Sequence, residues 1–155
     1  MVKRRQKIIG AFGTALACVV FFVAAERASE PSALEVVNVH FSNGSVARSM
    51  PIATTKAQQA QGLKGLEDVG RGMLFLWPEP NSLYFWMQDT PQPLTLAFFN
   101  DEYRITAIVD MQPFSEERHY SPGPALGAIE MPQGWFATVD VQPGMTFALE
   151  HADDP

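Results

Sequence analysis

Residues 34–53 read LEVVNVHFSNGSVARSMPIA and carry the clearest structural signal in the chain. Apolar and polar side chains alternate over residues 37–41, which is the period-two pattern of a strand with one buried face. Residues 42–45 follow with an Asn-Gly pair, which favours a tight hairpin turn. This stretch therefore predicts a β-hairpin whose second strand covers residues 46–53.

Further short apolar segments bounded by turn residues continue the same pattern along the chain. The predicted strands are 73–77, 83–87, 94–99, 103–111, 126–131 and 146–150. Residues 55–58 match a capping box and predict a short helix through about Leu63, and residues 135–139 predict a second one. Eight short strands and one or two small helices predict a mainly β fold, either a compact β-sandwich or a partly closed barrel.

An uncharged apolar segment, residues 8–25, precedes this domain. As a helix it would be roughly 27 Å long, just enough to cross the core of a bilayer. Four basic residues stand before it and acidic residues follow it, so the amino terminus is expected to stay on the cytoplasmic side and the domain to be exported. Small residues at Val23 and Ala25 also fit a signal peptide cleaved after Ala25.

The expected organisation has four parts. Residues 1–25 form a signal peptide or an uncleaved membrane anchor, two alternatives that stay open. Residues 26–33 form a polar linker, residues 34–151 the β-domain and residues 152–155 a tail. The domain is thus expected in the periplasm or outside the cell, either released or tethered to the cytoplasmic membrane through residues 8–25.

The net charge of −6 is unevenly distributed. From Glu26 onward the chain has seven basic and seventeen acidic residues, a net charge of −10. Such a domain has little with which to neutralise phosphates, so no nucleic-acid partner is expected. The lone cysteine, Cys18, lies inside the apolar segment, which leaves the exported part without disulfides or a thiolate nucleophile.

Residues 84–91, with the sequence YFWMQDTP, form the most distinctive motif. Alternation predicts Tyr84 and Trp86 on one face of a strand, with Phe85 and Met87 on the other, so that one pair enters the core. The other pair would give an aromatic surface beside polar groups, which is typical of a ligand pocket, although the same residues also suit an ordinary core and turn. The candidate ligand-binding residues are Trp86, Asp89, Thr90, Arg71 and Glu130.

Signatures of well-known enzyme classes are absent from the sequence, which has no phosphate-binding loop and no nucleophile elbow. Its three histidines lack a second ligand type at metal-binding spacing, so neither a metal site nor a cofactor is predicted. Several carboxylates fall near predicted strand ends, among them Asp89 and Glu130. If these two converge, they could support acid–base chemistry or hold a hard cation.

The order of several motifs resembles the DUF192 (UPF0127) family, small β-rich and often exported proteins of bacteria and archaea without an established activity. The resemblance runs from about Ala53 to Leu149. It includes Arg-Gly-Met-Leu-Phe at 71–75, Phe-Trp-Met at 85–87 and Ala-Ile-Glu at 128–130. The resemblance implies one compact β-domain of sandwich-like or jelly-roll-like architecture.

These observations favour an exported, non-catalytic accessory domain that binds a small ligand or an envelope protein. The first alternative is a carboxylate- or metal-assisted hydrolase that uses Asp89 and Glu130. The second is a structural subunit of an envelope assembly.

Overall fold

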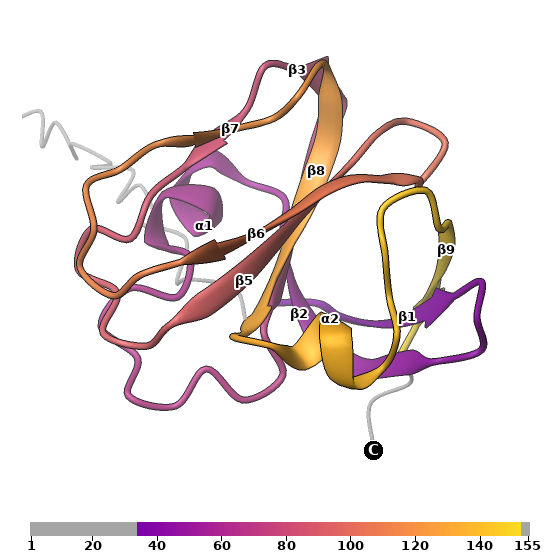
Figure 1. Ribbon diagram of the computed structural model, residues 1–155, viewed down its shortest axis with the longest axis horizontal. Helices are drawn as coiled ribbons and strands as arrows, with labels where there is room; N and C mark the ends of the chain where they lie inside the picture. The colour runs from indigo at the N-terminus through magenta and orange to yellow at the C-terminus, as the bar shows by residue number, and fades with distance from the viewer. Residues whose placement is uncertain (1–33, 153–155) are drawn as a thin grey trace, which may run out of the picture. The chain divides into compact units, whose positions relative to one another are not determined.

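A computed structural model describes residues 34–152, and Figure 1 shows their arrangement. This part contains nine strands and two short helices. They are β1 Val36–Phe41, β2 Val46–Ala53, α1 Lys56–Gln61, β3 Met73–Asn81, β4 Tyr84–Phe85, β5 Leu94–Phe99, β6 Ile105–Met111, β7 His119–Tyr120, β8 Ala125–Pro132, α2 Trp135–Thr138 and β9 Phe147–His151. The predicted signal or anchor segment and the linker lie outside the described residues.

Seven of the strands form one sheet in the order β6-β5-β8-β3-β2-β1-β9, while β4 and β7 form a separate two-stranded sheet. Neighbouring strands of the large sheet are antiparallel except β2 and β3, which are parallel. The large sheet curls into a half-barrel (Figure 1). The mainly β prediction is therefore confirmed in its partly closed barrel form.

The central strands of the sheet are buried on both faces, as β5 illustrates. All six of its residues are buried, and from Leu96 to Phe99 they alternate between two apolar clusters. Ala97 and Phe99 pack in one cluster with side chains of β1, β2 and β9, whereas Leu96 and Phe98 pack in the other with Phe75 of β3. The second cluster is the one beside α1 and the β4–β7 pair, and it positions the site described below.

The predicted hairpin is present, since β1 and β2 pair around the Asn-Gly turn, where Gly44 has a φ of +90°. The predicted strands 94–99 and 103–111 correspond to β5 and β6, which pair around residues 100–104. The predicted capping box at the start of α1 also forms, with Gln58 N donating to Thr55 Oγ1 at 3.3 Å and Thr55 N donating to Gln58 Oε1 at 3.0 Å.

Two predictions in the middle of the chain were wrong in detail. β3 continues to Asn81, beyond the predicted end at residue 77. Two prolines are tolerated there because Pro78 and Pro80 are exposed and the ladder to β8 is irregular between Leu76 and Asn81, where a missing N–H does little harm. The strand predicted over 83–87 is reduced to Tyr84–Phe85. Its partner β7 lies within a stretch that carries no strand signal in the sequence.

Candidate functional site

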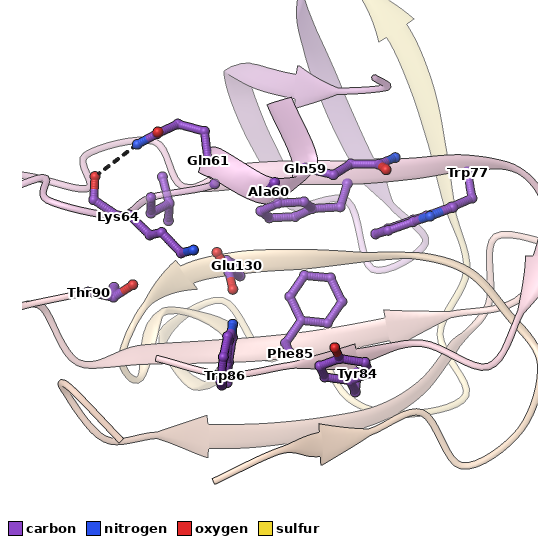
Figure 2. A pocket seen from close by; sticks show the side chains of 13 residues that line it. Gln59, Ala60, Gln61, Lys64, Trp77, Tyr84, Phe85, Trp86, Thr90 and Glu130 are labelled. Atoms are coloured by element: carbon purple, nitrogen blue, oxygen red, sulfur yellow. Dashed lines mark hydrogen bonds between the residues drawn. The ribbon is translucent and has the colours of Figure 1, made fainter. Parts of the chain in front are cut away.

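Side chains from four separate segments enclose a pocket of about 290 Å³ (Figure 2). One wall is α1 with the loop that follows it, from Gln59 to Lys64. Aromatic residues of β3 and the β4 segment form the other walls, and Glu130 comes from β8. The pocket thus lies over the second apolar cluster, where the central strands of the half-barrel are covered by α1.

Glu130 is the charged residue that the fold buries most deeply in this region. It lies two residues before the end of β8, opposite Met73 on β3 and Leu96 on β5, and is only 5% exposed. Desolvation by burial raises the pKa of its carboxyl group from 4.5 to about 8, so the protonated form predominates at neutral pH. Among the described residues, none forms a hydrogen bond or ion pair with this carboxyl group.

Aromatic rings surround the apolar side of the pocket. Phe85 packs edge-on against Phe75, with ring centroids 5.1 Å apart, and against Trp77 at 6.2 Å. These rings form the apolar lining of the pocket that Glu130 shares, and burial desolvates its carboxyl group.

Polar groups converge on the same carboxyl group from the other side. Figure 2 shows the indole nitrogen of Trp86, the hydroxyl of Thr90 and the ammonium of Lys64 all directed toward Glu130. None of the three forms a direct hydrogen bond with the carboxyl group, and all four residues line the pocket that a ligand would enter.

Backbone hydrogen bonds fix the two loops at this edge of the pocket. Gly65 N donates to Asp89 O at 2.8 Å, which ties the loop after α1 to the turn after β4. Thr90 N donates to Met87 O at 3.1 Å, and Phe114 N donates to Thr90 O at 3.0 Å. Gln59 Nε2 donates to Leu76 O at 2.9 Å and holds α1 on β3. The polar rim is thus built on a fixed backbone.

Three of the five predicted site residues, Trp86, Thr90 and Glu130, line this one pocket. The other two do not. Asp89 is exposed and adopts a left-handed φ of +58°, so it contributes turn geometry and its carbonyl rather than its carboxylate. Arg71 lines a different groove and donates to Ser49 O at 3.2 Å.

Sequence reasoning missed the contribution of α1 to the site. Gln59, Gln61 and Lys64 come to the pocket because the helix packs across β3, and only the capping box marked that helix in the sequence. Tyr84 and Trp77 also line the pocket. The alternation of residues 84–87 did predict that Tyr84 faces the same way as Trp86, and Phe85 and Met87 are indeed buried.

The predicted pairing of Asp89 with Glu130 is not found, since Glu130 is the only carboxylate among the lining residues of the pocket. Residues 34–152 contain no group of three or more histidine, cysteine or acidic side chains placed to hold a metal ion. Within the same residues, no helix is long and apolar enough to cross a membrane.

Fold and pocket together define a small β half-barrel domain with one buried carboxyl group in an aromatic cavity. The family model of DUF192, described as "Uncharacterized ACR, COG1430", matches residues 38–149. The chain therefore belongs to the DUF192 family.

Two solved structures share the fold. A protein of unknown function from Novosphingobium aromaticivorans DSM 12444 is 31% identical, with a TM-score of 0.68 over 81% of this chain and 94% of that one. A putative transcription regulator from Sinorhizobium meliloti 1021 is 26% identical, with a TM-score of 0.68 over 76% of this chain and 94% of that one. Comparison with curated proteins finds no significant match.

Proposed function

We propose that this chain is a non-catalytic accessory domain that binds a small ligand in the Glu130 pocket and works outside the cytoplasm. The observation that carries the proposal is the Glu130 carboxyl group, which belongs to a residue only 5% exposed, lines the pocket and forms no hydrogen bond within the described residues, so that its oxygen atoms are open to the pocket. Because burial desolvates this carboxyl group, a ligand that hydrogen-bonds to it gains a strong interaction inside the pocket, whereas a purely structural role would favour an apolar residue.

The lining and the size of the Glu130 pocket support a small ligand. An apolar, aromatic surface with a few fixed polar groups is the usual composition of a ligand site, and about 290 Å³ is at the lower end of the size range of such pockets. The charge of this chain argues against a transcription-regulator role like that suggested for the Sinorhizobium protein. From Glu26 onward its seven basic and seventeen acidic residues disfavour contact with DNA.

Export is supported by the amino-terminal sequence, in which four basic residues precede the apolar residues 8–25. Fractionation of cells that produce the full chain should place the domain outside the cytoplasmic membrane. Amino-terminal sequencing should then give Glu26 if the segment is a signal peptide, or the original terminus in the membrane fraction if it is an anchor. Recovery of the uncleaved chain in the cytoplasmic fraction would contradict export.

A thermal-shift screen of small metabolites against the full chain should identify compounds that raise the Tm by binding the folded state. Trp86→Ala and Glu130→Gln should each weaken binding of such a compound at least about tenfold, since each removes a group that faces the pocket. Arg71→Ala, in the separate groove, is the control and should leave the affinity unchanged. Equal binding by the wild type and all three variants would show that the ligand site lies elsewhere.

Catalysis by Glu130 is the second candidate function. A carboxyl group with a pKa of about 8 is protonated at neutral pH and could act as a general acid. If a compound found in the screen is consumed by the wild-type chain and not by Glu130→Gln, the domain is an enzyme and the non-catalytic proposal is wrong.

A further inference from the structure

An exposed aromatic surface lies directly outside the pocket. Tyr84 of β4 and Tyr120 of β7 are cross-strand partners with ring centroids 5.7 Å apart, and they are 50% and 60% exposed. The two rings pack on each other across the strands, and together they give this β-ribbon an exposed aromatic surface.

This surface is continuous with the pocket. Tyr84 and Trp86 both line the cavity, and the guanidinium of Arg118 lies over both rings, 5.0 Å from the centroid of Tyr84 and 5.6 Å from that of Trp86. Arg118 therefore bridges the pocket wall and the outer tyrosine pair. A ligand that fills the pocket and extends past Tyr84 would pass onto Tyr120.

The polar groups of the pocket restrict the chemistry of that ligand. Trp86 and Lys64 offer hydrogen-bond donors, Thr90 offers an acceptor and the protonated Glu130 offers both. A mixture of this kind complements hydroxyl groups, which donate and accept, better than it complements an anion, which only accepts. A cationic ligand is disfavoured by the ammonium of Lys64 in the pocket and by Arg118 at its rim.

Aromatic faces and hydroxyl-matching groups together are what a sugar ring requires. The negative face of an aromatic ring attracts the partly positive C–H groups on the flat side of a pyranose, while its hydroxyl groups take the polar positions. On this basis we propose that the site binds an oligosaccharide, with one sugar ring in the Glu130 pocket and the next ring on the surface formed by Tyr84, Tyr120 and Arg118. The inference rests on the proposed binding function and adds the ligand class and a second subsite.

The test measures affinity as a function of chain length. The full chain, kept in a detergent without a sugar headgroup, is titrated with glucose, galactose, mannose and N-acetylglucosamine and with their di- and trisaccharides. Binding is followed by tryptophan fluorescence, because Trp77 and Trp86 line the pocket. For at least one series, we expect the disaccharide to bind about fivefold to tenfold more tightly than the monosaccharide.

Variants assign the two subsites. Tyr120→Ala should abolish the gain from the second sugar and leave monosaccharide binding unchanged, because Tyr120 does not line the pocket. Tyr120→Phe keeps the ring and should retain the gain, which separates stacking from loss of fold. Trp86→Ala should weaken binding of every chain length. Leu66→Ala, at an exposed apolar side chain in the separate groove, is the control and should change nothing.

Each outcome bears on a different claim. A monosaccharide that binds through Trp86 without any gain for the disaccharide overturns the second subsite and leaves the pocket proposal intact. If no sugar binds at up to about 10 mM but another compound raises the Tm in a Trp86-dependent way, the sugar assignment is wrong and the binding function stands. If neither sugars nor screened compounds bind, both proposals are wrong.

Discussion

Raising the pH from 5 to 8 should destabilise the wild-type domain by about 3 kcal/mol relative to the Glu130→Gln variant. The cause is the buried carboxyl group, whose pKa rises from 4.5 to about 8 on folding. Below pH 4.5 the group is protonated in both the folded and the unfolded chain, and its stabilising effect is fully present. Between pH 4.5 and 8 the unfolded chain loses this proton first, so the free energy of unfolding falls as the pH rises.

Urea unfolding of the full chain at several pH values measures this effect. The wild-type free energy of unfolding should decline between pH 5 and 8, while Glu130→Gln, which has no ionisable group at this position, should lack that component. Glu67→Gln, at an exposed glutamate, is the matched control and should follow the wild type. If Glu130→Gln and the wild type show the same pH dependence, the Glu130 carboxyl group is not desolvated as its burial indicates.

The same residue explains how far the sequence could predict the site. Glu130 falls near the end of the predicted strand 126–131 and also near the end of β8, but the structure adds that β8 lies between β3 and β5 there. The sequence shows that residue 130 is a glutamate but does not show that it is buried. The burial arises when α1 and the aromatic residues of the β4 segment cover this face of the sheet. The sequence offers Asp89 as a second candidate carboxylate for the site. Its left-handed backbone and its exposure instead give it a role in the turn.

Prediction of the fold succeeded where the signal is local. Alternation and an Asn-Gly turn specify the β1–β2 hairpin, and the capping box specifies α1, because these patterns depend on residues close in the chain. β7 was missed since a two-residue strand is defined only by its partner β4, some thirty-five residues earlier in the chain. The curl of the sheet is also non-local: it depends on the order of the strands, which a single sequence does not encode in any short motif.

Gly72→Ala should lower the free energy of unfolding by about 3 kcal/mol or more. A loss of this size would leave little folded protein in a domain this small. Gly72 lies in the Arg-Gly-Met-Leu-Phe motif, just before β3, with a φ of +68° that favours glycine. A Cβ atom added there would collide with the backbone carbonyl oxygen of Glu130. The β8 backbone cannot move away easily, because it is hydrogen-bonded between β3 and β5.

Gly65→Ala is the matched control for this prediction. Gly65 has nearly the same φ, +72°, but an added Cβ would meet no atom within 4 Å. The free energy of unfolding of Gly65→Ala should fall only by the cost of placing alanine in the left-handed conformation, about 1 kcal/mol. Urea unfolding of both variants therefore separates backbone strain from the collision with β8, and equal losses would contradict the close approach. Folded protein recovered from Gly72→Ala should also bind pocket ligands more weakly, because the displaced strand carries Glu130.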